Sequence, residues 1–190
     1  MYWGEKDFFK YFFDSNFSIY SDKISKFIIR IYEKDNELIF HRLARIYDYV
    51  FIDEIQDLAG YDLDIIKNIY SSIKNVIAVG DPRQTTYSTH HSQKYEKYSK
   101  GKIKNYFLEH LNGICEIDEV TLCKSHRNEP IICHISSQLF PDFTPSESCV
   151  CCNDSHIEHL GVFYVPESKK LSYLEQYKPI QLRWDSRNKK

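Results

Sequence analysis

Two short apolar runs, each ending in acidic residues, constrain the fold of this 190-residue chain more than any other feature. Tyr49–Ile52 is apolar at every position and is followed at once by Asp53-Glu54. Asn75–Val79 largely repeats the pattern and leads into Gly80-Asp81. Unbroken apolar runs of this length are typical of central parallel strands that are buried on both faces. The sequence therefore predicts two such strands.

The spacing of apolar residues predicts helices around these strands. A helix between them, with Asp62 as its cap, makes a right-handed strand–helix–strand crossover whose strands are parallel. The predicted helices cover Lys6–Phe13, Lys23–Tyr32, Leu38–Tyr47, Leu63–Ser72, Asn105–Leu111, Pro130–Leu139 and Lys169–Tyr177, and the further strands cover Glu116–Leu122, Gly161–Val165 and Pro179–Trp184. We therefore expect an open α/β fold.

The acidic residues that follow the two strands indicate a ligand site, because ligands of open α/β sheets bind outside the carboxyl ends of the strands. Asp53, Glu54 and Asp81 would meet there, and magnesium prefers a few carboxylates together with retained waters. Each Asp is followed three residues later by a glutamine, Gln56 or Gln84. The alternative is that both Asp residues only cap the loops that follow them, as Asp commonly does.

Composition narrows the class of protein. Apolar residues make up 42% of the chain, which is enough for a packed core. The net charge of −2 gives the whole chain no strong attraction to nucleic acid, so any such contact must come from a local patch. No apolar run approaches the roughly 18 residues of a membrane helix, so no membrane partner is expected. Six irregularly spaced Cys indicate reduced thiols, and the expected location is cytoplasmic.

Ordered motifs resemble those of superfamily 1 DNA helicases of the UvrD/Rep type. Tyr49–Asp57 is similar to motif II, four apolar residues followed by DExQD, and Val79–Tyr87 is similar to motif III, GDxxQxxY. Leu122–Arg127 resembles motif IV, although His126 stands where the family usually has an aromatic residue. Ile180–Arg187 resembles motif IVa more weakly.

The resemblance implies a P-loop NTPase fold, which is a RecA-like parallel sheet with flanking helices, here incomplete at both ends. It divides the chain into a helical lead-in (residues 1–45), part of the first motor domain (46–122, motifs II and III) and the start of the second (123–190, motifs IV and IVa). Gln56 and Asp57 are expected to tie motif II to motif III through loop hydrogen bonds.

The resemblance also implies a role for each matching residue, with ATP and Mg²⁺ as cofactors. Asp53 would hold magnesium through water, and Glu54 would be the base that orients the attacking water. Asp81 would help to bind the cofactor, and Gln84 would reach the γ-phosphate. Arg127 would enter from the next domain and offset charge that builds on the γ-phosphate.

The phosphate-binding loop of this family has no counterpart in the sequence. The chain has six Gly, and none opens a GxxxxGK[ST] motif, whose backbone and Lys hold the β- and γ-phosphates. We therefore expect a fragment of an ATP-dependent DNA helicase or translocase that is inactive without the remainder of the motor. The alternative is a non-catalytic helicase-like adaptor that binds DNA or a nuclease partner.

A nucleic-acid contact is predicted after motif III. Tyr87 is expected to stack on a base, although Ser88–His91 replaces the RWRG-like run that often follows in the family. Lys94, Lys97 and Lys100 lie in a segment that interleaves cations with aromatic residues up to Lys104. This segment either tracks the phosphates of single-stranded or duplex DNA or is a solvated connector, and the sequence leaves both open.

Two further patterns were weighed. The runs IDEIQDLAGYD and GDPRQTTYSTHH resemble a UvrD-like group found beside bacterial anti-phage nucleases, which implies a nuclease partner of the OLD type. Cys149, Cys151, Cys152, His156 and His159 carry zinc-type ligands within a short stretch. Because the stretch has no CxxC pair and Cys-Val-Cys-Cys is too tight for a zinc knuckle, a zinc site is not expected.

Overall fold

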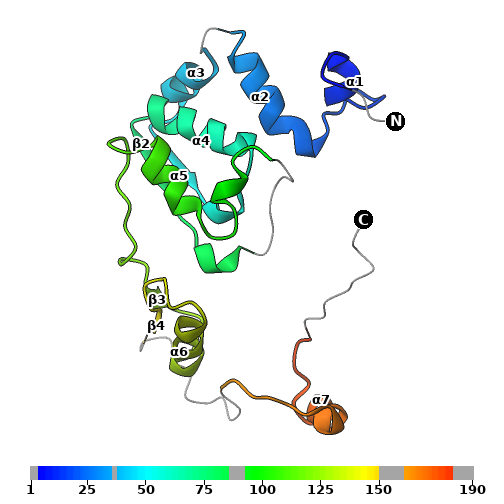
Figure 1. Cartoon of the computed structure of the whole chain (residues 1–190), viewed down its shortest axis with the longest axis vertical. Helices are drawn as coiled ribbons and strands as arrows, with labels where there is room; N and C mark the ends of the chain where they lie inside the picture. The colour runs from blue at the N-terminus through cyan, green and yellow to red at the C-terminus, as the bar shows by residue number, and fades with distance from the viewer. Residues whose placement is uncertain (1–3, 36–37, 86–92, 150–160, 182–190) are drawn as a thin grey trace. The chain divides into compact units, whose positions relative to one another are not determined.

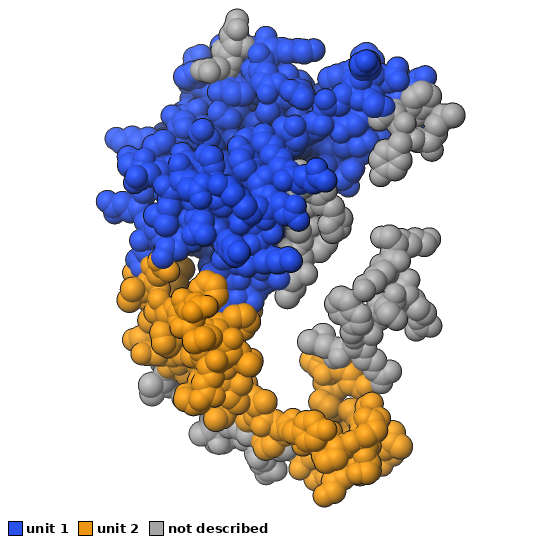
Figure 2. All heavy atoms as spheres, viewed as in Figure 1, with its two compact units in different colours: residues 1–118 blue, residues 119–190 orange. Residues whose placement is uncertain are grey.

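The computed structural model describes residues 4–35, 38–85, 93–149 and 161–181 (Figure 1). It combines helices with small parallel sheets, which confirms the α/β class. The chain forms two compact units, residues 1–118 and residues 119–190 (Figure 2). Each unit is described by itself.

The first unit contains five helices and two strands among its described residues. They are α1 (Phe8–Phe12), α2 (Ile24–Tyr32), α3 (Leu38–Ile46), β1 (Tyr49–Ile52), α4 (Tyr61–Ser72), β2 (Asn75–Ala78) and α5 (Ile103–His110), with short 3-10 helices η1 (Ser21–Lys23), η2 (Ile55–Asp57), η3 (Pro82–Gln84) and η4 (Glu96–Tyr98). Every predicted helix of this unit is present, and its ends lie within two residues of the prediction.

Strands β1 and β2 pair in parallel, as the sequence predicted. Tyr49 lies opposite Asn75, and Ile52 lies opposite Ala78. The helix between them, α4, makes the crossover, and it begins at Tyr61 rather than at the predicted Leu63. Gly60, with a φ of 58°, precedes it, so Asp62 is not the cap but lies in the first turn, where Oδ2 accepts a hydrogen bond from the Ala59 N–H at 3.3 Å.

One face of the two-stranded sheet is covered by the core of the unit. Ile52 and Ala78 pack against a cluster of buried side chains from α4 and α5. Its most buried members are Leu63 at 1% exposure and Tyr106 and Leu111 at 0%. These helices therefore fix the position of both strand ends.

The opposite face of the sheet is bare, which contradicts the expectation of strands buried on both sides. Tyr49, Phe51 and Ile77 point to this face and are 60%, 73% and 50% exposed. The register places Phe51 beside Ile77, and the rings of Tyr49 and Phe51 stack. Apolar residues at every strand position fit two covered faces, but the described helices cover only one.

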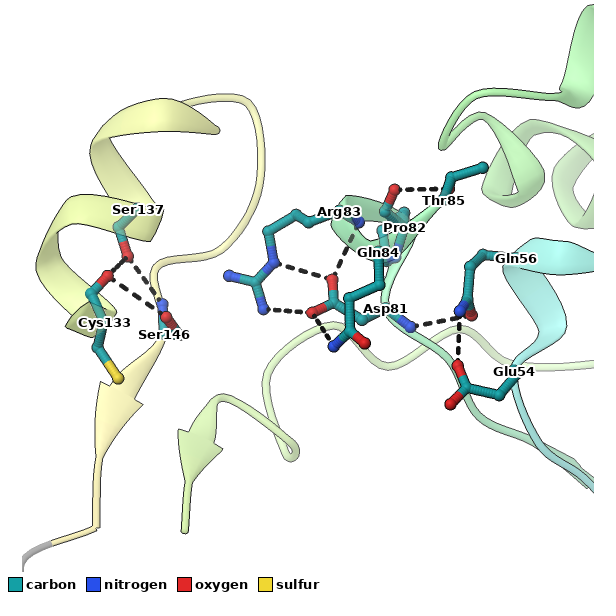
Figure 3. A network of polar contacts seen from close by, with 10 residues as sticks. All are labelled: Glu54, Gln56, Asp81, Pro82, Arg83, Gln84, Thr85, Cys133, Ser137 and Ser146. Carbon is teal, nitrogen blue, oxygen red and sulfur yellow. Dashed lines mark hydrogen bonds and ion pairs between the residues drawn. The ribbon is translucent and has the colours of Figure 1, made fainter. Parts of the chain in front are cut away.

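The second unit has little core. It contains β3 (Lys124–Ser125), α6 (Pro130–Leu139), β4 (Glu147–Ser148), η6 (Glu167–Lys169) and α7 (Lys170–Tyr177), and β3 pairs with β4 in parallel. Cys133 is buried, and its carbonyl accepts a hydrogen bond from the Ser137 hydroxyl at 2.8 Å (Figure 3). Ser137 Oγ in turn accepts from the Ser146 N–H at 3.1 Å.

Two predicted strands are wrong, and a third lies partly outside the described residues. Residues 116–122 form bends and turns, and residues 161–165 form no strand. Residues 179–181 are also irregular, whereas 182–184 are not described. The reason is that β propensity acts only where a neighbouring strand offers its hydrogen bonds and a face to cover, and these segments meet none in the described chain.

Candidate functional site

The ends of β1 and β2 bring motif II and motif III to the same edge of the sheet. The Val79 N–H donates to the Ile52 carbonyl at 2.8 Å, and the Ile55 N–H donates to the Val79 carbonyl at 3.1 Å. The ladder thus continues past both strands as the chain turns into η2 and η3. Asp53-Glu54 and Gly80-Asp81 follow the two strands directly at this edge.

Gln56 joins the two motifs, as the sequence predicted (Figure 3). Its side chain is buried, with 6% of the residue exposed. Oε1 accepts from the Asp81 N–H at 3.2 Å, and Nε2 donates to Glu54 Oε2 at 2.6 Å. No such side-chain bond joins Asp57 to motif III, and Asp57 Oδ1 is buried without a hydrogen-bond partner in the described part of the chain.

Gly80 leaves room for the Gln56 amide. A Cβ at this position would lie 2.3 Å from Gln56 Oε1 and 2.8 Å from Ile55 Cγ2. Both distances are well inside van der Waals contact, so a larger residue would displace the amide or the strand end. Glycine in GDxxQ therefore has a packing reason in this chain.

Glu54 adopts a left-handed backbone conformation, with φ 52° and ψ 42°. This region is uncommon for residues other than Gly, Asn and Asp and costs on the order of 1–3 kcal/mol. The conformation turns the chain from β1 into η2 within one residue. The Glu54 side chain is exposed apart from its contact with Gln56.

Asp81 is held by the residues that follow it. Its Oδ1 accepts from Arg83 Nε at 2.8 Å and from the Arg83 N–H at 3.0 Å, and its Oδ2 accepts from Arg83 Nη2 at 3.0 Å and Gln84 Nε2 at 3.1 Å. Burial acts to raise the pKa of Asp81, but these hydrogen bonds and the Arg83 charge outweigh it and lower the pKa. Asp81 thus caps η3, the alternative that the sequence left open.

Arg83 had no role in the sequence analysis. The two-residue separation from Asp81 was a local sign of the pair, because a side chain at that spacing in a turn can reach back to the carboxylate. The guanidinium binds the carboxylate through two nitrogens, which is the strong form of this ion pair.

Asp53 presents a carboxylate to solvent. Its Oδ1 accepts from the Glu54 N–H at 2.8 Å, and Oδ2 has no hydrogen-bond partner within the described chain. One exposed carboxylate oxygen beside a second carboxylate suits magnesium, which keeps several of its waters. Among the described residues, no group of three or more His, Cys, Asp and Glu could enclose a metal ion directly.

Two lysines expected to contact nucleic acid form ion pairs within the first unit. Lys94 Nζ lies 2.5 Å from Asp64 Oδ2, and Lys97 Nζ lies 2.6 Å from Glu109 Oε2. Lys100 is exposed and has a left-handed backbone. These pairs hold the segment against α4 and α5 and neutralise part of its charge.

The aromatic residues of the same segment belong to the core. Tyr98 is 3% exposed, and its ring lies edge-on to Tyr106. The Tyr95 hydroxyl donates to Asp64 Oδ1 at 2.9 Å. Burial, and next this bond to the Asp64 carboxylate, raise the pKa of Tyr95 to about 12, so the hydroxyl remains a donor at neutral pH. The segment is therefore not simply a solvated connector.

The remaining predicted residues are placed as follows. Arg127 is exposed in the second unit, in the turn between β3 and α6, where its N–H donates to Ser125 Oγ at 3.4 Å. Tyr87 lies outside the described residues, as do Cys151, Cys152, His156 and His159. Cys149 is described and is a free thiol.

Comparison with known proteins decides the family. The UvrD/REP helicase N-terminal domain matches residues 12–100, the stretch that carries motifs II and III. This part of the chain belongs to the UvrD/Rep helicase family. A probable DNA helicase II homolog of Mycoplasma capricolum subsp. capricolum is 33% identical over 73 residues, which is 38% of this chain and 10% of that protein. The UvrD/Rep match thus spans a small part of its relative's length.

The described helices of this UvrD/Rep chain were also compared with the dimensions of a bilayer. None of them is long and apolar enough to cross a membrane.

Proposed function

We propose that this chain carries the magnesium-binding and water-activating half of the ATP site of a DNA helicase or translocase motor. The observation that supports the proposal best is the hydrogen-bonded chain from Glu54 through Gln56 to Asp81 and Gln84, which links motif II to motif III at one sheet edge. In a complete motor, β1 and β2 would be strands of a RecA-like sheet, and further strands and helices would cover the bare face.

The residues at this edge would divide the work of ATP hydrolysis. Asp53 would hold hydrated magnesium, which neutralises charge on the phosphates. Glu54 would orient the attacking water and accept its proton, and Gln84 would contact the γ-phosphate. Arg127, on the second motor domain, would stabilise the charge of the transferring phosphoryl group. Positioning and charge stabilisation are the main contributions a protein makes to this reaction.

The proposal assigns Asp81 a supporting part. All four hydrogen bonds to its carboxylate come from Arg83 and Gln84, so the group is already satisfied within the loop. Asp81 would therefore act on the cofactor by holding Gln84, not by binding magnesium itself.

The remainder of the motor and DNA are the proposed partners. The phosphate-binding loop must come from sequence other than these 190 residues, because they contain no GxxxxGK[ST] motif. Any DNA contact by this chain alone would be weak, since the net charge is −2 and two of the candidate lysines are ion-paired.

The lack of a phosphate-binding motif also favours a second candidate function. A helicase-like adaptor would keep the paired strands and the hydrogen-bonded site but would bind DNA or a nuclease partner without turning over ATP. The resemblance of IDEIQDLAGYD and GDPRQTTYSTHH to the phage-defence group is what connects this adaptor with a nuclease of the OLD type.

ATP turnover tests the proposal. The 190-residue chain should hydrolyse no more ATP than its Glu54→Gln variant in the presence of magnesium, because nothing in it holds the β- and γ-phosphates. When supplied with a motor segment that carries GxxxxGK[ST], the chain should gain magnesium-dependent turnover. Glu54→Gln should abolish that gain, and an unaffected rate in the variant would refute the assigned base.

A further inference from the structure

The buried amide of Gln56 connects the candidate base to the loop that carries Asp81 and Gln84. We infer that Gln56 is a positioning residue, which fixes the Glu54 carboxylate relative to the end of β2 and to η3. The inference rests on the proposed role of Glu54 and adds what holds that side chain in place.

The contacts allow only one orientation of the Gln56 amide. Oε1 faces the Asp81 N–H, which is a donor, and Nε2 faces the Glu54 carboxylate, which is an acceptor. The flipped amide would set its oxygen against the carboxylate and its nitrogen against the N–H, losing both hydrogen bonds. Because Gln56 is buried, leaving either end unsatisfied would be costly.

Glu54 needs such a partner. Its side chain is exposed, and its left-handed backbone places it on a sharp turn. An exposed glutamate without a fixed contact samples several rotamers. The Nε2 bond at 2.6 Å, donated to a charged acceptor, is of the short and strong kind. Gln56 therefore limits the positions that the Glu54 carboxylate can take.

The same amide joins Glu54 to motif III. Asp81, whose N–H Gln56 accepts, also accepts a hydrogen bond from Gln84 Nε2. A displacement of η3 that follows contact between Gln84 and a ligand would therefore pull on Gln56 and move the Glu54 carboxylate. Gly80 is part of this connection, because only glycine leaves room for the amide.

Hydrogen exchange of the Gln56 side-chain amide tests this connection in the full chain without nucleotide. The experiment compares the wild type with Glu54→Gly, since glycine tolerates the left-handed backbone and should fold. Removing the carboxylate should speed exchange of the Gln56 Nε2 protons roughly tenfold or more, the loss expected for a hydrogen bond to a charged group. The Asp81 backbone amide should keep its wild-type exchange rate, because Oε1 still accepts it.

Glu96→Gly is the matched control, because Glu96 is an exposed glutamate of the same unit whose side chain makes no contact with Gln56. Gln56→Met provides the second arm: the Asp81 amide should lose protection, and the Glu54 side-chain carboxyl carbon resonance should shift. A Gln56 that merely fills space would leave that resonance unmoved. Unchanged Nε2 exchange in Glu54→Gly, or an unmoved Glu54 resonance in Gln56→Met, would overturn the inference. Neither readout uses ATP, so a failed turnover test would leave both results intact.

Discussion

At the scale of single residues, the site depends on a glycine whose importance lies in what occupies its missing side chain. Gly80 sits where a Cβ would overlap the Gln56 amide oxygen and the Ile55 side chain. The neighbour is a buried side chain held at both ends by hydrogen bonds, so it cannot simply rotate away. The requirement is therefore steric and does not arise from a left-handed backbone.

Gly80→Ala should consequently destabilise the first unit by about 1–3 kcal/mol, the range for overpacking a filled site. Chemical denaturation followed by circular dichroism measures the change. Gly4→Ala is the matched control and should stay within about 0.5 kcal/mol, because a Cβ at Gly4 meets nothing within 4 Å. Equal stability of the two variants would mean that the Gln56 amide does not occupy the position described.

At the scale of elements, the segment that contains η4 shows how one stretch can combine packing with charge. Its tyrosines enter the core of the first unit, and Lys94 and Lys97 pair with carboxylates on α4 and α5. Lys100 and Lys102, in contrast, are exposed. Any attraction to nucleic acid should therefore come more from the second pair of lysines than from the first.

A salt series with labelled single-stranded DNA tests this division. If the segment contacts phosphates, Lys100→Ala with Lys102→Ala should lower the log–log salt slope by about 1.4, since each contact on single strands contributes about 0.7. Lys94→Ala with Lys97→Ala removes the same charge but should change the slope less, because those ammonium groups are already paired. Fluorescence anisotropy gives both slopes. Binding that ignores salt and both double variants would leave the segment a purely structural element.

What the sequence predicted well was local in origin. The apolar runs at β1 and β2, their parallel pairing and the bridge by Gln56 follow from periodicity and from a motif whose residues are close in sequence. The bare sheet face, the burial of Tyr98 and the absent strand over 116–122 depend on which distant segments arrive to cover or pair. Such contacts leave little trace in the order of residues.

At the scale of the whole molecule, the two units differ in how much apolar surface they bury. Among the described residues, Cys133 is the one buried core residue of the second unit, whereas the first unit has a continuous cluster built on α4 and α5. Large apolar side chains of the second unit are open to solvent, such as Leu122 at 78% and Tyr164 at 92%. Local opening should therefore cost less free energy in the second unit.

Limited digestion with trypsin should reflect this difference. Cleavage should begin after residue 118, at exposed sites such as Lys124 and Arg127, and a resistant product spanning α2 to α5 should persist. Mass spectrometry of the time course identifies the fragments. Early cuts inside α4 or α5, at rates matching those in the second unit, would contradict the described distribution of core residues.

The left-handed backbone of Glu54 has a consequence for how mutation acts on this chain over generations. Glycine at this position would relieve conformational strain of about 1 kcal/mol, enough to change the ratio of folded to unfolded chains roughly fivefold. A lineage that had no use for a carboxylate here would gain stability by drifting to glycine or asparagine. Glutamate at position 54 is thus a stability–activity compromise, and it favours a chain still under selection for chemistry over one retained only as a scaffold.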